Sequence, residues 1–353
     1  MTLPWHDTPP RRIVVFRALQ LGDMLCAIPA LRAMRQAWPT AHIALIGLPN
    51  AASFVARFSR YIDELIIFPG IPEFPEQIAR VHELPAFYAN VRDRRFDLAV
   101  QMQGSGGPAN DIVAGLGAAH WVGFVPDPAL DEPGRLLLWP DELPEALRFT
   151  ALMQHIGLDV DDTRLEFPFS TDDDVAVDRL VDACGIDVTR TIVIHPGARL
   201  LSRRWPVERF AQVGQALAVQ GWQLAVTGSD DERALTRTLL AALPAGAADL
   251  TGQTSLGSLA ALLARTRLLI CNDTGVSHVA AGVRARSVVV ASGSDVNRWA
   301  PLDRHLHRVL WHDVPCRPCG YHACPIGHPC ALGVSADAVL AVVHDQLAAP
   351  VME

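Results

Sequence analysis

The sequence predicts an α/β protein built from two doubly wound domains of similar size. The chain has 353 residues, enough for two ordinary domains of roughly 100–200 residues each. Short, continuously apolar segments alternate with amphipathic stretches in both halves, which is typical of parallel strands covered by helices on both faces. An acidic, aperiodic stretch at residues 158–174 lies between the halves and is expected to link them.

The first half contains the strands and helices of one domain. Its opening run, RIVVF at residues 12–16, is apolar and partly β-branched, as expected for a buried parallel strand. The expected strands are 12–16, 43–47, 64–68 and 96–100, and the expected helices are 23–37, 51–59, a long stretch between 68 and 96, and 145–157. Residues 126–144 are rich in Pro, Asp and Glu and are expected to form a loop.

The second half repeats this alternation. The expected strands are 191–194, 222–226, 268–271 and 287–290, and the expected helices are 206–220, 231–243, 255–265, 276–282 and 335–347. Pro206 suits the first turn of a helix, and Ser335 suits an N-cap. The domains are expected to span residues 1–165 and 166–353, the second with a Cys-rich loop at 314–330 and a terminal helix. The strand ends of two such domains, facing each other, predict a ligand cleft.

All 30 basic residues are arginines, because the chain contains no lysine. This composition excludes chemistry that needs a Lys Schiff base and excludes the GxxxxGK phosphate loop. Any fixed cation that holds a phosphate must therefore be an arginine. The net charge of −8 argues against a nucleic-acid partner.

The N-terminal residues 1–12 are polar and Pro-rich, without the apolar core of a signal peptide. No apolar run approaches the roughly 18–20 residues that cross a bilayer. We therefore expect a cytoplasmic protein, with contact to a membrane surface left open.

The first candidate site is RALQLGD at residues 17–23, between the first expected strand and the first helix. A loop at the carboxyl end of a first strand is a common ligand position in doubly wound domains. Gly22 permits close approach, and Asp23 supplies a carboxylate. The alternative is that Asp23 only caps the helix, and the loop by itself favours this interpretation.

The second candidate site combines HPGAR at residues 195–199 with SRRWP at 202–206. Gly197 can bring backbone N–H groups to an anion, and the helix that begins near Pro206 offers its positive end. The arginines here could clamp a diphosphate, since guanidinium groups bind phosphate bidentately. The alternative is a solvated basic loop.

The third candidate site is CNDTGVSH at residues 271–278, between an apolar strand and a helix. Gly275 and the free N–H groups beside it predict an anion-binding nest. Asp273, Thr274 and His278 add a carboxylate, a hydroxyl and an imidazole. The alternative is helix capping by Asp273 or Thr274, with His278 as a packed core residue.

The fourth candidate site is the Cys-rich loop, with Cys316, Cys319, Cys324 and Cys330 within fifteen residues. Four thiolates at this spacing suit tetrahedral Zn²⁺, or iron, in a structural role. The alternatives are reduced structural thiols and a disulfide.

These segments together resemble glycosyltransferase family 9, the heptosyltransferases of lipopolysaccharide core assembly, over almost the whole chain. RALQLGDMLCAIPALRAMRQAWPTAHIALIG is similar to the family's opening strand, Gly-Asp loop and first helix. HPGA, RRWP, TGSDDERA, RWAPL, the NDTG-x-x-H segment and the CxxC loop are similar to its C-terminal motifs.

The resemblance implies a GT-B fold, with two Rossmann-like domains facing a cleft. It implies an inverting transfer from an ADP-activated heptose to a lipid-linked oligosaccharide, without a cofactor for catalysis, at the cytoplasmic face of the inner membrane. Asp23 matches the family's general base, and Gly22 and Arg17 belong to the same acceptor-side loop.

The resemblance also implies a donor site in the second domain. Arg203 matches a position where relatives often carry Lys on the diphosphate, and Thr274, Gly275 and His278 match further diphosphate contacts. Asp273 matches a residue near the sugar, and either Asp230 or Glu232 matches an acidic residue on the ribose.

Other functions stay open at this point. A GVRARSV segment at residues 282–288 replaces the Gly-x-Pro turn that is common in the family, which leaves the donor sugar and the acceptor undecided. A nucleotide-sugar epimerase, a glycosyltransferase acting on proteins or natural products, and a non-catalytic nucleotide-sugar-binding scaffold are the alternatives.

Overall fold

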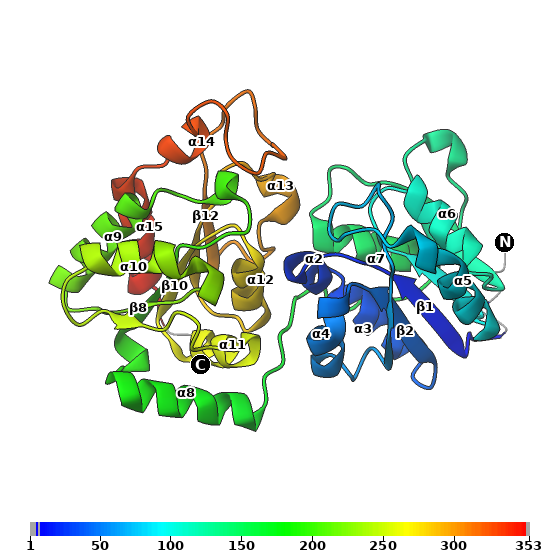
Figure 1. Cartoon of the computed structure of the whole chain (residues 1–353), viewed down its shortest axis with the longest axis horizontal. Coiled ribbons are helices and arrows are strands. Elements are labelled where there is room, and N and C mark those ends of the chain that lie inside the picture. Colours follow the sequence, from blue (N-terminus) through cyan, green and yellow to red (C-terminus); the bar gives the residue numbers. More distant parts are fainter. Residues whose placement is uncertain (1–4, 6–7, 351–353) are drawn as a thin grey trace. The chain divides into compact units, whose positions relative to one another are not determined.

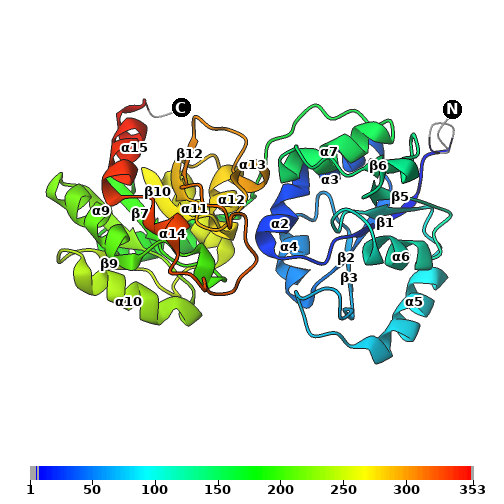
Figure 2. The same cartoon turned by 90° about the horizontal axis from the view of Figure 1, so that it is seen from above.

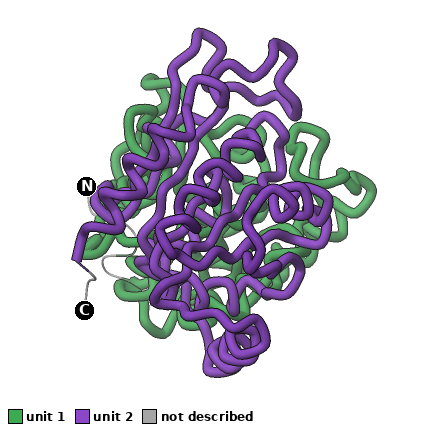
Figure 3. Tube along the Cα trace, turned by 90° about the vertical axis from the view of Figure 1, so that its left-hand side faces the viewer, with its two compact units in different colours: residues 1–164 green, residues 165–353 purple. Residues whose placement is uncertain are grey.

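The structure, a computed structural model, describes Trp5 and residues 8–350. The chain divides into two compact units, Met1–Arg164 and Leu165–Glu353 (Figure 3). This division lies one residue from the boundary expected from the sequence. The expectation that residues 1–12 contain no signal peptide stays a prediction. Half of this segment lies outside the described residues.

The first unit is built on a six-stranded sheet in which every neighbouring pair is parallel. The strand order is β3-β2-β1-β4-β5-β6. The strands are β1 (Arg12–Phe16), β2 (His42–Gly47), β3 (Glu64–Ile67), β4 (Leu98–Gln101), β5 (His120–Val125) and β6 (Leu136–Leu138). This is the order of the Rossmann fold, whose direction reverses between β1 and β4.

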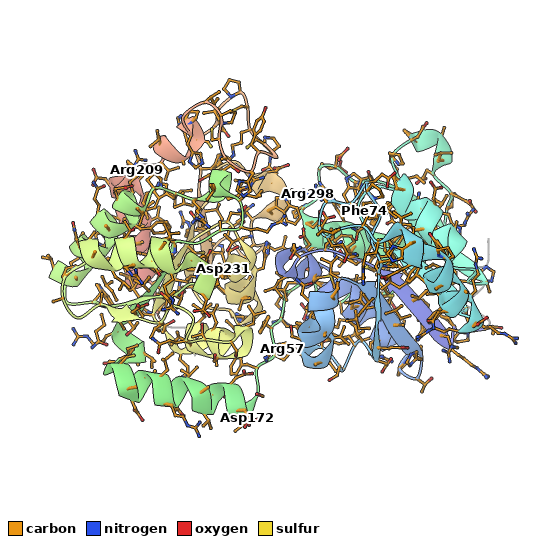
Figure 4. The ribbon with its side chains drawn as sticks, viewed as in Figure 1. Arg57, Phe74, Asp172, Arg209, Asp231 and Arg298 are labelled. Atoms are coloured by element: carbon orange, nitrogen blue, oxygen red, sulfur yellow. The ribbon has the colours of Figure 1, made fainter. Side chains whose placement is uncertain are left out.

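Helices cover both faces of this sheet, with α3 and α7 on one side and α5 and α6 on the other (Figure 2). The helices are α2 (Leu21–Cys26), α3 (Ile28–Ala37), α4 (Ala52–Arg57), α5 (Leu84–Asp93), α6 (Pro108–Gly115) and α7 (Glu145–His155). Short 3₁₀ turns lie at Pro49–Ala51, Val81–Glu83 and Pro128–Leu130. The Phe74 ring, labelled in Figure 4, lies 6.2 Å from Phe16 and 6.3 Å from Phe68 in the core beneath α5 and α6.

The second unit repeats the same topology with the strand order β12-β11-β10-β7-β8-β9, again all parallel. The strands are β7 (Thr191–His195), β8 (Gln223–Val226), β9 (Ala248–Asp249), β10 (Leu268–Asn272), β11 (Ser287–Val290) and β12 (His307–Leu310). Its direction reverses between β7 and β10, so this pair marks the expected ligand position.

The helices of the second unit also form two layers, with α9, α10 and α15 on one side and α11 and α12 on the other (Figure 1). They are α8 (Thr171–Cys184), α9 (Val207–Val219), α10 (Arg233–Ala242), α11 (Leu256–Arg265), α12 (Gly275–Gly282), α13 (Val296–Trp299), α14 (Pro329–Leu332) and α15 (Ala336–Ala348). The 3₁₀ turns are η4 (Val188–Arg190), η5 (Leu201–Arg203) and η6 (Asp230–Glu232). Arg209 of α9, labelled in Figure 4, donates from Nη1 to Ala331 O of α14 at 3.2 Å. In the described part of the chain, no helix is both long and apolar enough to cross a membrane.

The predicted α/β class and doubly wound topology are confirmed, and several elements differ. The expected helix 23–37 is two helices, because the N–H of Ala27 turns back to Met24 O and Pro29 has no N–H to continue the ladder. Strand β6 lies inside the segment expected to be a loop, and β5, β9, β12 and α8 were not predicted. Pro206 is the N-cap of α9 rather than a residue of its first turn, whereas Ser335 caps α15 as expected.

Candidate functional site

The loop after β1 lies at the switch point of the first sheet, beside the carboxyl end of β4. Phe16 pairs in register with Gln101, and the N–H of Met102 donates to Phe16 O at 3.0 Å. Asp23 is half-buried in the first turn of α2, whose N-cap is Gln20 without a side-chain cap bond. The interpretation of Asp23 as an N-cap is therefore wrong.

Gly22 and Arg17 occupy different depths of this loop. Gly22 is half-buried beside Asp23. Arg17 is fully buried, and its guanidinium donates to the backbone oxygens of Asp23 and Met102. Arg17 thus belongs to the loop, as expected, but its side chain is buried beneath the loop and bonds to the loop's main chain.

A glycine-rich loop after β4 completes this end of the sheet, and the sequence reasoning missed it. The N–H of Ala18 donates to Gln103 Oε1 at 2.7 Å, which joins the two loops. Three glycines within residues 104–107 have positive φ angles of 83°, 122° and 61°. Such angles suit glycine, and the run GSGG before a proline was the signal available in the sequence.

One buried side chain joins three predicted segments at the switch point of the second sheet. Asn272 Oδ1 accepts from the N–H of Trp205 at 2.8 Å, and its Nδ2 donates to the carbonyl oxygens of Pro196 at 2.7 Å and Gly197 at 3.3 Å. Asn272 is fully buried. The HPGA, RRWP and NDTG segments therefore meet here, through a residue to which the sequence reasoning gave no role.

The TGSDDERA segment reaches the same place through Glu232. Its Oε2 accepts from the Ser229 N–H at 2.9 Å and lies 3.9 Å from His195 Nε2. A Cβ on Gly197 would lie 2.0 Å from Glu232 Oε1, so the carboxylate can occupy this position only beside a glycine and would have to move for a larger residue. Burial lowers the pKa of His195, and the charge of Glu232 opposes that shift. Asp230, by contrast, has a side chain that is 75% exposed and paired with a nearby arginine.

Arg203 lies in turn η5 and is held against the Cys-rich loop. Its Nη2 donates to Cys319 O at 2.7 Å, and the neighbouring Ser202 N–H donates to His322 O at 3.0 Å. Its Nη1 is buried without a hydrogen-bond partner among the described residues. Burial lowers the pKa of this guanidinium, whereas the charges of Cys319 and Asp273 raise it. A donor without a partner therefore lies near the NDTG segment.

The NDTG segment forms the start of α12. The Thr274 hydroxyl accepts an N–H of the first turn at 3.3 Å, and Gly275 is the first helical residue. N–H groups at a helix start lack partners within their own helix and carry a partial positive charge. His278 is buried, with its ring edge-on to Trp299 at a centroid distance of 6.4 Å. Thr274 thus caps the helix, and the anion-binding roles of this segment, with Asp273 beside it, stay predictions.

The four cysteines of the Cys-rich loop line a single pocket, together with Arg203's neighbour Ser202 and with Tyr321 and His328. All four are free thiols. Burial raises the pKa of Cys330, and the charges of the other three cysteines add to this shift. Over the described residues, no group of three or more His, Cys, Asp or Glu side chains is arranged to hold a metal ion. The structural Zn²⁺ or iron therefore stays a prediction.

Comparison with known proteins decides the family. The sequence model of Glycosyltransferase family 9 (heptosyltransferase) matches residues 85–329. The chain belongs to glycosyltransferase family 9. The matched span of this family 9 chain contains every donor-side candidate residue, whereas Asp23 lies before it.

Individual members of family 9 are more distant. The chain is 31% identical to lipopolysaccharide heptosyltransferase 2 of Escherichia coli (strain K12) over 120 residues, which are 33% of this chain and 34% of that protein. It is 23% identical to lipopolysaccharide heptosyltransferase 1 of Pseudomonas aeruginosa over 333 residues, which are 89% of this chain and 87% of that protein. The first alignment thus spans about a third of the curated relative's length.

Solved structures of family 9 show the same fold. The family 9 glycosyltransferase from Veillonella parvula superposes with a TM-score of 0.76 at 18% identity, over 96% of this chain and 97% of that one. The E. coli heptosyltransferase WaaC with ADP-2-deoxy-2-fluoro heptose gives 0.68 at 18% identity, over 95% and 99%. The two Rossmann-like units are therefore those of the GT-B fold.

Proposed function

We propose that this protein is an inverting glycosyltransferase that moves a heptose from ADP-heptose to an acceptor hydroxyl of the lipopolysaccharide inner core. Membership of family 9 supports the reaction class. The meeting of the HPGA, RRWP, TGSDDERA and NDTG segments around Asn272 and Glu232 supports a nucleotide-sugar site in the second unit. The acceptor in this proposal is a lipid-linked oligosaccharide, so the reaction takes place at the cytoplasmic face of the inner membrane.

The donor diphosphate is proposed to bind beside Arg203. A guanidinium with an N–H donor to spare suits a phosphate oxygen, and a charge-assisted hydrogen bond is stronger than a neutral one. Thr274 and Gly275 add a hydroxyl and the positive end of α12, and His278 and Asp273 lie in the same segment. For the ribose we favour Glu232 over Asp230, because Glu232 lies against the HPGA loop at the switch point.

Asp23 is proposed as the general base. The acceptor oxygen attacks the anomeric carbon, and the proton of its hydroxyl passes to the Asp23 carboxylate. The bond between the anomeric carbon and the phosphate oxygen breaks, and its electron pair leaves with ADP. Arg203 and the start of α12 would stabilise the negative charge that develops on ADP, which lowers the barrier because these donors are already in place. No cofactor takes part in this mechanism.

A donor screen tests this proposal. ADP-heptose, ADP-glucose, and UDP- and GDP-sugars are compared by thermal shift and by sugar transfer to a lipid-linked core acceptor. We expect ADP-heptose to stabilise the protein and to be consumed, and Asp23→Ala to keep ADP binding while losing transfer. Stabilisation by a UDP-sugar but not by ADP-heptose would overturn the donor assignment. Near-normal transfer by Asp23→Ala would remove the proposed base.

The Cys-rich loop carries a separate proposal, a structural Zn²⁺ or iron ion held by Cys316, Cys319, Cys324 and Cys330. The shared pocket supports it, since it places the four cysteines around one space, and a cation bound there would favour their deprotonation to thiolate ligands. The thiols would have to close around the ion. Elemental analysis of the purified protein tests the proposal, and less than about a tenth of an equivalent of Zn or Fe, with four titrating thiols, would remove it.

A further inference from the structure

A cluster of three buried charged side chains lies beneath the Asp23 loop. Arg17 follows β1, and Glu145 and Arg148 lie in the first turn of α7. Their side chains are 0%, 2% and 3% exposed. Burying charges is unfavourable unless they are paired and hydrogen-bonded, and an apolar cluster of the same volume is often as stable. The position of these charges therefore calls for a reason beyond stability.

Arg17 binds the main chain of Asp23. Its Nε donates to Asp23 O at 2.9 Å, its Nη2 donates to the same oxygen, and its Nη1 donates to Met102 O at the end of β4. Helix α2 ends early, because the N–H of Ala27 bonds to Met24 O, three residues back. The planar guanidinium thus supplies donors to a helix carbonyl and ties the first turn of α2 to the sheet.

Glu145 and Arg148 hold Arg17 in this position. The two oxygens of Glu145 divide between the arginines, with Oε1 3.5 Å from Arg17 Nη2 and Oε2 3.5 Å from Arg148 Nη1. Arg148 also donates from Nε to Leu143 O at 2.8 Å and from Nη2 to Asp141 O at 2.6 Å. Arg17, Glu145 and Arg148 are called the anchor below. Through Arg148, the anchor is bonded to the loop that precedes α7.

Aromatic rings enclose the two guanidinium groups. The Cζ atom of Arg17 lies 4.2 Å from the centroid of the Phe149 ring, and that of Arg148 lies 4.7 Å from the Trp139 ring. Both contacts are within the range of a cation–π interaction. In these apolar surroundings the attraction of each guanidinium to Glu145 is weakly screened, so the fork of Arg17 has one preferred orientation.

We infer that Glu145 and Arg148 are positioning residues for Asp23, acting through the guanidinium of Arg17. The anchor fixes the first turn of α2, and with it the direction in which the Asp23 carboxylate points. The catalytic meaning of this inference rests on the proposed function, because only that function makes Asp23 a base. The mechanical part, that a charge on α7 orders the Asp23 loop, does not depend on it.

Glu145→Gln is the test variant, because it keeps the size of the side chain and removes the charge that both arginines face. Glu132→Gln is the matched control, since Glu132 pairs with Arg135 at the surface of the same unit, with both side chains about two-fifths exposed. Arg17→Lys is the second variant, which keeps the buried charge but cannot donate to two carbonyls as a fork.

The first measurement is amide hydrogen exchange of the intact protein without substrate. Glu145→Gln is expected to speed exchange in the peptide covering residues 18–27 by roughly ten-fold or more, with little change in β2 and β3. Arg17→Lys is expected to do the same, and Glu132→Gln to match the wild type. Unchanged exchange at residues 18–27 in both test variants would overturn the inference, whatever the enzyme does.

The second measurement is steady-state transfer together with ADP binding. Glu145→Gln is expected to lower kcat by roughly ten- to hundred-fold, as a misplaced catalytic group does, with the Kd for ADP unchanged. Loss of ADP affinity in parallel with kcat would instead indicate general unfolding and would overturn the positioning role. If the wild type transfers no sugar while the exchange result holds, the proposed function fails and the loop anchor stands.

Discussion

Asn272→Ala gives a quantitative test of the donor-side architecture. The substitution removes the side chain that accepts from the Trp205 N–H and donates to Pro196 O, and both of those groups are deep in the second unit. A buried polar group left without a partner costs about 1–3 kcal/mol. Two such groups give a loss of ~4 kcal/mol in the free energy of unfolding. For a unit of this size each kcal/mol lowers Tm by about 2–4 °C, so the expected shift is ~8–16 °C.

Differential scanning calorimetry of the ligand-free protein measures this shift, and titration calorimetry measures ADP binding. Asn297→Ala is the control, because Asn297 is exposed on α13 in the same unit. We expect Asn272→Ala to weaken ADP binding as well, since the three segments it joins would separate. A melting temperature within about 2 °C of the wild type would show that these hydrogen bonds do not hold the segments together.

Three further predictions concern single residues. Arg203→Met is expected to weaken ADP binding by roughly ten- to hundred-fold and AMP binding less, as for a lost charged hydrogen bond; equal ADP affinity by calorimetry would contradict this. Gly197→Ala places a Cβ 2.0 Å from Glu232 Oε1 and so moves that carboxylate, whose Oε2 accepts from the Ser229 N–H. Loss of this hydrogen bond should cost about 0.5–1.5 kcal/mol of stability, whereas Gly320→Ala, with nothing within 4 Å of its Cβ, should be neutral in denaturant unfolding. Burial lowers the pKa of His307 to about 4 from 6.5. The unfolded chain therefore binds this proton at higher pH than the folded one, and stability falls by ~3 kcal/mol as pH drops from about 6.5 to about 4. His307→Gln should flatten that slope, and an unchanged slope would assign it to other groups.

Several of the elements that the sequence reasoning missed have weak patterns of their own. Strands β6 and β9 have three and two residues, too few to show periodicity, and they exist because a neighbouring strand supplies the pairing. The start of helix α8 lies within the segment 158–174 that is expected to be an acidic linker, although Ser170 and Asp173 form a capping box there. Only one of its residues is fully buried, so the apolar period that reveals a helix is faint.

Local patterns in the sequence indicate which segments are candidates for holding a ligand, but not what each side chain does there. From the sequence, Asp230 and Glu232 are equal candidates for the acidic residue on the ribose. In the structure the Glu232 carboxylate lies against Gly197, whereas the Asp230 side chain is exposed. Arg17 was expected in a ligand-binding loop, and the structure buries it beneath that loop. In both cases the difference comes from a neighbour far along the chain, which no local pattern records.

The sequence by itself determined the doubly wound class, the four candidate site segments and the dependence on arginine for any phosphate. These follow from local rules: apolar runs pair as buried strands, glycines permit close approach, and a chain without lysine has only guanidinium groups for a strong fixed cation. Only the tertiary structure decided that Asn272 joins segments 76 residues apart and that Glu145 supports the Asp23 loop across 128 residues of chain. The physical reason is that a buried side chain forms a hydrogen bond or ion pair only where the fold places a matching carbonyl or charge next to it. The order of the strands determines which distant segments become neighbours in this way.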